Sequence, residues 1–317
     1  MNSLWTRWLS TQPEVLDVEA AQLAESPVWN PFAQTLCWVD IEGGVLHQMS
    51  AIGVQATQLT APLSAVALTR DGLLLVMGRG VYSVEADGSQ PRLLWTITGD
   101  DEVKLNDCRV DGRGRLWVGS VATNPQRATG KLYRLAPHRE DGVEAVVMAE
   151  GIGLSNGIDF SPDDQVMYLA DSRAGVVEAF DLDTDTGALS GRRTFAQVDD
   201  GSPDGLTVDN QGGVWLAVWG GWEIRRYRPD GSLDKTVRLP VAQVTSCAFA
   251  GPTLDVLVAS TARENLSAAE LRTQPDAGRL FAWRPGVTGR PQRRCALRAP
   301  VLCAPSPNIV GADHDAG

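Results

Sequence analysis

Four side chains that carry oxygen ligands recur in similar short motifs far apart in the chain. They are Glu25, Asn106, Asn156 and Asp204, and we expect each at the start of the first strand of its motif. Carboxylate and amide oxygens are hard ligands, which suit Ca²⁺, Mg²⁺ or Mn²⁺ better than softer metals. Two carboxylates buried together without a cation would repel each other and lose their hydration. If the fold brings these four side chains together, they predict a cage for one divalent cation.

Each of these residues also has a simpler interpretation. Asn and Asp are common in β-turns because their side chains hydrogen bond to the nearby backbone. For one residue alone we favour that interpretation, whereas four residues at the same place in a repeat favour a site. We interpret the neighbouring Asp107, Asp159 and Asp209 as turn or backbone-bonding residues.

The motifs belong to a unit that repeats six times along the chain. Each copy is a short strand pattern, a polar turn and a second apolar strand pattern, and the clearest copies occupy 105–121, 154–171 and 202–219. The positions taken as equivalent in the six copies are Glu25, Ser64, Asn106, Asn156, Asp204 and Ser246. Their intervals of 39 to 50 residues are typical of propeller blades. The sequence therefore predicts an all-β fold, a six-bladed β-propeller with four-stranded blades around a central channel.

This fold would place the four oxygen-bearing side chains at one mouth of the channel, because the first strand of each blade lines it. We expect one propeller domain over residues 1–317, with its core at about 15–295 and a disordered tail at about 304–317. A short helical pattern at 265–274 indicates an insertion into the last blade.

The loops between the second and third strands of the blades should share the face of that mouth and set specificity. These second-to-third-strand loops lie near 119–130, 171–175, 219–222 and 261–278. Trp219 and Trp222 belong to one of them, where each would either stack on a sugar ring or pack between blades. We interpret Trp38, Trp117 and Trp215 as core residues.

The overall composition excludes some classes of partner. The net charge of −11 argues against nucleic acid and anionic membrane surfaces, both of which need a basic face. Five cysteines without a C-x-x-C spacing indicate reduced thiols. We see neither a signal-peptide pattern nor an apolar run of membrane-spanning length, so we expect a cytoplasmic protein that is a monomer or a weak homo-oligomer.

Four motifs now resemble a known family. They are AESPVW at 24–29, LND at 105–107, LSNGIDFSPD at 154–163 and SPDGLTVD at 202–209. In this order and spacing the chain resembles the senescence marker protein-30/gluconolactonase/luciferin-regenerating enzyme family, which includes regucalcin and bacterial sugar lactonases. The resemblance covers roughly residues 15–295, and it implies a six-bladed propeller with a single divalent metal.

The resemblance also implies roles for particular residues. The metal would be held by Glu25, Asn156 and Asp204, with Ca²⁺ or Mn²⁺ favoured and Zn²⁺ or Fe²⁺ as alternatives. Asn106 would lie close to the metal and contact the substrate. Where the family usually carries a substrate-contacting Arg, this chain has Lys104, which keeps the charge but loses the bidentate fork. The family's acidic residue in the third blade is missing from GSVATN at 119–124.

The chemistry expected from this site is hydrolysis of a sugar lactone. A divalent ion would polarise the lactone carbonyl, and Asp204 would take a proton from the attacking water as general base. Asn106, Lys104, Trp219 and Trp222 are the candidate substrate contacts. Two alternatives stay open: a calcium-binding regulatory propeller without catalytic activity, and a related hydrolase acting on another ester or an organophosphate.

Overall fold

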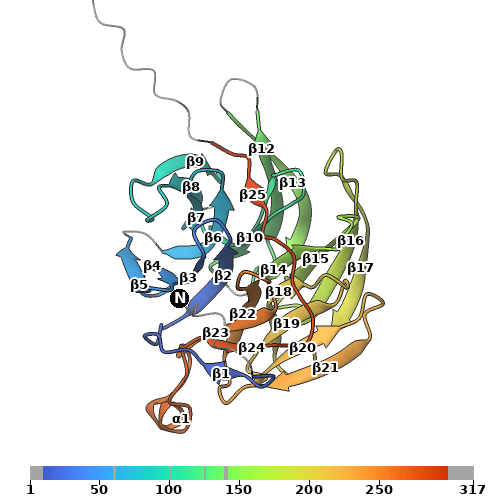
Figure 1. Cartoon of the computed structure of the whole chain (residues 1–317). Helices are drawn as coiled ribbons and strands as arrows, with labels where there is room; N and C mark the ends of the chain where they lie inside the picture. Colours follow the sequence, from blue (N-terminus) through green and yellow to red (C-terminus); the bar gives the residue numbers. More distant parts are fainter. Residues whose placement is uncertain (1–9, 60–61, 100, 125, 139–141, 299–317) are drawn as a thin grey trace, which may run out of the picture.

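Six antiparallel sheets stand around a central axis in the computed structural model of the chain (Figure 1). The structure describes residues 10–59, 62–99, 101–124, 126–138 and 142–298. Inner strands of successive sheets contact each other all the way round, and the last contacts the first. The predicted six-bladed β-propeller is therefore confirmed.

The first three blades are consecutive along the chain, and each begins with its innermost strand. Blade one contains β2 (Ala24–Asn30), β3 (Thr35–Asp40), β4 (Val45–Ser50) and β5 (Gly53–Gln58). Blade two contains β6 (Leu63–Thr69), β7 (Leu73–Met77), β8 (Gly80–Val84) and β9 (Arg92–Thr96). Blade three contains β10 (Val103–Val110), β11 (Leu116–Ala122), β12 (Gly130–Pro137) and β13 (Val143–Ile152).

The last blade differs from the others because its outermost strand comes from the start of the chain. Blade four contains β14 (Ser155–Phe160), β15 (Val166–Asp171), β16 (Val176–Leu182) and β17 (Leu189–Gln197). Blade five contains β18 (Ser202–Val208), β19 (Val214–Trp219), β20 (Glu223–Tyr227) and β21 (Leu233–Arg238). Blade six contains β22 (Val244–Ala250), β23 (Val256–Thr261), β24 (Phe281–Trp283) and then β1 (Glu14–Val15). Pairing of β1 with β24 closes the ring.

A C-terminal segment, residues 286–297, crosses the channel at the end away from the starts of the inner strands. Its strand β25 (Arg294–Cys295) runs parallel to β6 at the channel side of blade two. Its other backbone hydrogen bonds reach turns that follow inner strands: Gly289 N to Leu254 O (2.7 Å), Ala296 N to Gly114 O (2.8 Å) and Asn210 N to Thr288 O (2.9 Å). This closing segment therefore covers the end of the channel opposite the predicted site.

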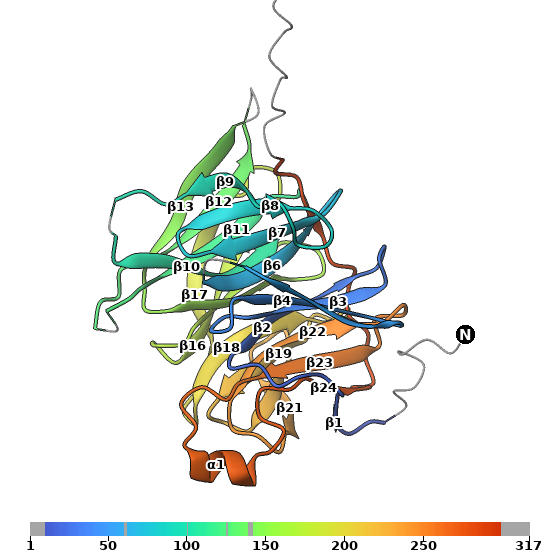
Figure 2. The ribbon, with the colours of Figure 1, turned by 90° about the vertical axis from the view of Figure 1, so that its left-hand side faces the viewer.

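Apolar side chains fill the space between neighbouring blades. Trp38, Trp117 and Trp215 are at most 1% exposed, which confirms their predicted core positions. The helical pattern in the last blade is confirmed by α1 (Ala268–Thr273), which begins with a capping box on Ser267. In the described part of the chain no helix has the length and apolar character needed to cross a bilayer. Figure 2 shows α1 standing out from one edge of the ring.

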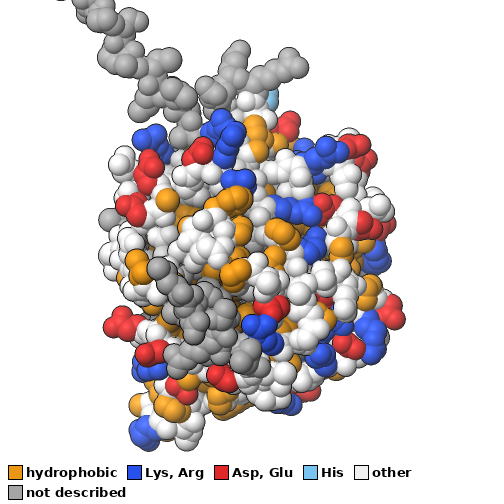
Figure 3. All heavy atoms as spheres, viewed as in Figure 1, with side chains coloured by type: hydrophobic (Ala, Val, Ile, Leu, Met, Phe, Trp, Pro, Cys, Tyr) orange, Lys and Arg blue, Asp and Glu red, His pale blue; other side chains and the backbone are white. Residues whose placement is uncertain are grey.

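The surface carries charges of both signs. Acidic and basic side chains alternate over the described residues of the face in Figure 3, without a continuous basic area. The predicted tail at about 304–317 lies outside the described residues.

Two buried aspartates fix the turns between first and second strands. Asp209 is fully buried and accepts hydrogen bonds from the backbone N–H groups of Gln211 and Gly213, as predicted for a turn residue. Its other oxygen accepts from Trp215 Nε1 (2.9 Å) and Arg226 Nε (2.8 Å). Asp111 makes the corresponding set of bonds in blade three, to Trp117 and Arg115. Each aspartate joins a turn, a core tryptophan and an arginine.

We expect Asp209→Ala to destabilise the fold strongly, because it leaves the buried Arg226 guanidinium and Trp215 N–H without this partner. Removing one member of a buried ion pair costs about 3–5 kcal/mol. Urea unfolding should show this loss, while Asp230→Ala, at an exposed turn, should change the free energy of unfolding by less than about 1 kcal/mol. Equal effects of the two substitutions would contradict the structural role of Asp209.

Candidate metal centre

Every inner strand has a break in its pairing register close to its start. The breaks fall between Glu25 and Val28, Leu63 and Ala65, Leu105 and Cys108, Ser155 and Ile158, Pro203 and Leu206, and Val244 and Ser246. Irregularities of this kind turn side chains away from the regular alternation of a strand. The breaks therefore let the polar residues of each motif face the channel.

The breaks correct the equivalence that the repeats suggested. Ser64, Asn106, Asn156 and Asp204 lie inside their breaks, but Glu25 precedes its break by one position. In blade six the residue inside the break is Thr245, and the residue chosen from the sequence, Ser246, follows it. The sequence pattern located these residues within one position, because the motif alone does not reveal how a strand pairs.

Two glycines explain why the motifs in blades four and five read Asn-Gly and Asp-Gly. A Cβ atom on Gly157 would lie 2.4 Å from Leu206 N, and one on Gly205 would lie 2.0 Å from Ser246 Oγ. Only a residue without a side chain allows the next inner strand to come so close. The glycines therefore let Asn156 and Asp204 converge on the channel axis.

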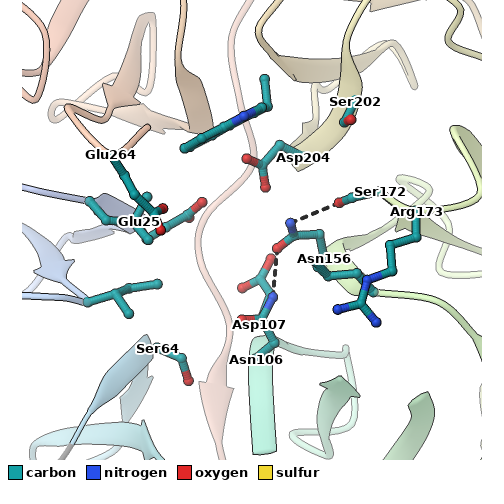
Figure 4. A pocket seen from close by; sticks show the side chains of 14 residues that line it. Glu25, Ser64, Asn106, Asp107, Asn156, Ser172, Arg173, Ser202, Asp204 and Glu264 are labelled. Atoms are coloured by element: carbon teal, nitrogen blue, oxygen red, sulfur yellow. Dashed lines mark hydrogen bonds between the residues drawn. The ribbon is translucent and has the colours of Figure 1, made fainter. Parts of the chain in front are cut away.

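A cavity of about 310 Å³ lies at the mouth where the inner strands begin (Figure 4). Glu25, Asn106, Asn156 and Asp204 all line it, so the fold brings together the four side chains that the motifs singled out. Figure 4 shows their polar groups directed into the same space from four blades.

The two amide side chains are oriented by hydrogen bonds. Asn106 Nδ2 donates to Asn156 Oδ1 (2.9 Å) and to the backbone oxygen of Ser155 (3.0 Å). Asn156 Nδ2 donates to Ser172 Oγ (3.0 Å). Because an amide oxygen has two lone pairs, Asn156 Oδ1 keeps one acceptor site beyond its bond to Asn106.

The carboxylates of the cavity are in an unfavourable electrostatic environment. Glu25 and Asp204 are 8% and 5% exposed. Burial raises the pKa of both groups; the charge of Asp107 adds to the shift at Glu25, and the charges of Glu25 and Asp107 add to it at Asp204. Asp204 Oδ1 is buried and has no hydrogen-bond partner among the described residues. Such an unpaired acceptor costs free energy unless a ligand satisfies it.

This donor set fits a hard divalent cation. A cation would relieve the repulsion between Glu25 and Asp204 and give the unpaired Asp204 oxygen a partner. Among the described residues, no three His, Cys, Asp or Glu side chains lie close enough to hold a metal by themselves. An amide oxygen would have to complete the ligand set, and Asn156 is placed to supply it.

The acid deeper in the channel differs sharply from those at the mouth. Asp159 accepts hydrogen bonds from Phe160 N (2.9 Å) and Val208 N (2.8 Å), which confirms its predicted backbone bonding. It also pairs with Arg109 at 2.8 Å, a contact that the sequence did not reveal. Burial alone would raise the pKa of Asp159, but the charges of Arg109 and Arg290 outweigh it and hold the pKa at about 2. Asp159 is thus a satisfied structural anion.

Asp107 combines features of the carboxylates at the mouth and of the satisfied Asp159. Its Oδ1 accepts from the backbone of Cys108 at 2.7 Å, as predicted for a backbone-bonding residue, yet it also lines the cavity. Burial raises its pKa to about 6, against the opposing effects of the Cys108 hydrogen bond and the Arg109 charge. Asp107 therefore adds negative charge near Glu25 and Asp204, which increases the site's preference for a cation.

The predicted substrate contacts are placed unequally. Trp219 lines the cavity, whereas Lys104 and Trp222 are not among its lining residues. Lys104 lies on the exposed rim, where its charge lowers the pKa of Glu264, a group whose pKa is raised by burial and by Glu42. Trp222 is 39% exposed and has a positive φ of 61°. The substrate contacts of all three stay predictions.

The cavity also has lining residues that the sequence analysis did not single out. Ser172 and Arg173 follow β15, and Glu264 follows β23, within two of the loops expected to set specificity. The loop near 119–130 supplies no described lining residue. One sequence signal could have located Arg173: Asp171 ends its strand as Asp40 does in blade one, and each accepts backbone hydrogen bonds from a neighbouring turn.

Comparison with known proteins shows the family of the chain. The sequence profile of the family described as SMP-30/Gluconolactonase/LRE-like region matches residues 23–263. The chain belongs to this family. The matched residues include Glu25, Asn106, Asn156 and Asp204 at the channel mouth.

Relatives of this SMP-30/gluconolactonase-like propeller include named lactonases. A 6-deoxy-6-sulfogluconolactonase of Pseudomonas putida is 37% identical over 274 residues, which cover 84% of this chain and 92% of the relative. Pentonolactonase XacC of Haloferax volcanii is 34% identical over 297 residues, covering 91% of this chain and 99% of the relative. The crystal structure of a calcium-binding protein, regucalcin, from Agrobacterium tumefaciens superposes with a TM-score of 0.83 at 26% identity, covering 92% of this chain and 98% of that one.

We expect the stability of the metal-free propeller to fall as the pH rises. Glu25 and Asp204 have folded-state pKa values above those of the unfolded chain, so the folded state loses stability as the pH rises and they must ionise. Thermal unfolding in chelator between about pH 5 and pH 9 should show this decline, and a saturating divalent cation should offset it most at high pH.

Glu25→Gln is the matched test of this explanation, because it removes one of the two ionising groups at nearly constant volume. The pH dependence in chelator should become weaker in this variant, and the stabilisation by cation smaller. If cation stabilises both proteins equally at every pH, the pair is not the binding site.

Proposed function

We propose that this propeller is a divalent-metal-dependent hydrolase that opens a sugar lactone to the corresponding sugar acid. The observation that carries the proposal is Asp204 Oδ1, a buried carboxylate oxygen without a protein partner that borders an open cavity beside Glu25 and Asn156. A purely structural carboxylate in this fold, such as Asp209, has its hydrogen bonds satisfied by the protein.

The proposed ligands are Glu25, Asn156 and Asp204, and oxygen donors favour Ca²⁺ or Mn²⁺, with Zn²⁺ or Fe²⁺ as alternatives. When bound, a divalent ion would supply Lewis-acid polarisation of the lactone carbonyl and a lowered pKa for bound water. Three protein ligands leave room in the cavity for a substrate oxygen and a water molecule.

The residues of the chain would carry the remaining steps. Asp204 accepts a proton from the water that attacks the carbonyl carbon, and the ring C–O bond then breaks as the ring oxygen becomes a hydroxyl group. Asn106, held by its bonds to Asn156 and Ser155, would orient a ring oxygen or hydroxyl group. Lys104 and Trp219 would contact the sugar at the rim and the wall.

Two of the relatives support lactones as the substrate class. Their names describe hydrolysis of a sulfogluconolactone and of a pentonolactone. The alternative of a calcium-binding propeller without catalytic activity has a counterpart in the regucalcin structure. We favour the enzyme because a cavity of about 310 Å³ next to the ligands is more space than ion binding requires.

Turnover of a lactone panel tests the proposal directly. With a divalent ion, at least one of gluconolactone, xylonolactone, arabinonolactone and galactonolactone should be hydrolysed in a pH-indicator assay, and chelator should abolish the activity. Including a phenyl ester and an organophosphate separates the related hydrolases. Absence of chelator-sensitive turnover on every lactone would instead favour the binding protein.

Asp204→Ala tests the proposed general base. We expect kcat/KM to fall by at least about 10³-fold, because both proton transfer and one metal ligand are lost. Circular dichroism should show the fold unchanged. The exposed Asp87→Ala serves as control and should keep wild-type activity. Full activity of Asp204→Ala would remove this residue from the mechanism.

A further inference from the structure

Arg173 places a positive charge in the wall of the cavity opposite its acidic side. Glu25 belongs to blade one and Glu264 to blade six, whereas Arg173 follows β15 in blade four, across the channel. Figure 4 shows the two glutamates on one side of the space and the arginine on the other. A substrate in this cavity therefore meets opposite charges at its two sides.

The arginine is held firmly in position. Asp171, which is 3% exposed, fixes the loop by accepting four backbone hydrogen bonds, from Gly153 (2.8 Å), Leu154 (3.0 Å), Arg173 (3.2 Å) and Ala174 (3.2 Å). The aliphatic stem of Arg173 lies against Gly153, where a Cβ atom would be 2.7 Å from Arg173 Cβ. The side chain is therefore pre-organised, and little conformational entropy would be lost on binding a ligand.

The hydrogen bonds of Arg173 to the protein leave two of its five N–H donors unused. Nη1 donates to Gly153 O (2.8 Å) and Arg127 O (3.4 Å), and Nη2 donates to Ala122 O (3.2 Å). A guanidinium group has five N–H donors, so Nε–H and one N–H of Nη2 stay available. Charged N–H donors of a guanidinium group form strong hydrogen bonds to carboxylate, phosphate and sulfonate oxygens.

No acidic side chain in the described part of the chain forms an ion pair with Arg173. Other arginines of the same blade are paired: Arg192 with Glu178 at 2.9 Å and Arg193 with Asp181 at 2.7 Å. Its neighbour Ser172 accepts the hydrogen bond from Asn156, and Arg173 lines the same cavity as the proposed metal ligands.

We propose that Arg173 binds an anionic group on the substrate, at the end away from the lactone carbonyl. The substrate class is then a sugar lactone that carries a phosphate, sulfonate or carboxylate group, oriented by attraction to Arg173 and by repulsion from Glu264. This inference rests on the proposed lactonase function, and it assigns Arg173 as the residue that sets specificity.

The test compares a charged and a neutral lactone of the same ring. Initial rates are measured on δ-gluconolactone and on 6-phosphogluconolactone generated in situ, for the wild type, Arg173→Gln, Arg173→Lys and Arg193→Gln. The last variant removes the same charge from an exposed position on the same blade. Titration calorimetry with 6-phosphogluconate and gluconate measures binding independently of turnover.

We expect Arg173→Gln to lower kcat/KM for the charged lactone about 10- to 100-fold, mainly through KM, and to leave the neutral lactone within about twofold. Arg173→Lys should restore part of the loss, because it keeps the charge without the guanidinium donors. Arg193→Gln should behave as the wild type. Calorimetry should show preferential binding of 6-phosphogluconate that Arg173→Gln abolishes.

The outcomes separate this inference from the proposed function. Equal losses on both lactones in Arg173→Gln, or a wild type without preference for the charged lactone, would overturn the role of Arg173. If no lactone is hydrolysed but 6-phosphogluconate binds through Arg173, the anion site stands and the lactonase proposal is wrong.

Discussion

The mouth of the channel depends on an electrostatic constraint: acidic side chains from different blades must share a small buried space. Burial raises the pKa values of Glu25 and Asp204, the charge of Asp107 adds to both shifts, and the charge of Glu25 adds to the shift at Asp204. The rigid ring prevents them from moving apart, since each stands beside a register break in an inner strand that is packed between two others. Only protonation or a bound cation can relieve the repulsion.

The same residue type has opposite functions at different depths of this propeller. Asp209 stabilises a turn and Asp159 joins neighbouring blades, because both have arginine and backbone partners. Asp204 has an oxygen without a partner, and burial, together with the nearby charges of Glu25 and Asp107, makes its ionised form unfavourable. Groups whose ionisation is opposed by their surroundings are typical of sites that act on a ligand, because the protein has left their interactions incomplete.

The repeated pattern allowed the fold and the four oxygen-bearing residues to be predicted from the sequence. A blade period and an Asn or Asp at a fixed place in three of the six units can be recognised in the sequence, and Asn106, Asn156 and Asp204 follow from them. The positions of Glu25 and Thr245 relative to the register breaks cannot be predicted in this way, because they depend on how β2 pairs with β3 and β22 with β23. Arg173 was not predicted either, since its orientation results from carbonyl groups of blade three and the Asp171-bound turn. The closing strand β1 lacks the repeat's motif, so nothing in the periodicity pointed to it.

Pairing of β1 with β24 makes the outer edge of blade six one of the last parts of the propeller to form during biosynthesis. The outer edge of the last blade is completed by residues from the beginning of the chain, which must wait for β24 to leave the ribosome. Glu25 in blade one and Asp204 in blade five face each other across blade six, whose inner strand β22 contacts both β2 and β18. A chain without blade six would therefore hold these two carboxylates on an open arc, without the separation that the closed ring gives them.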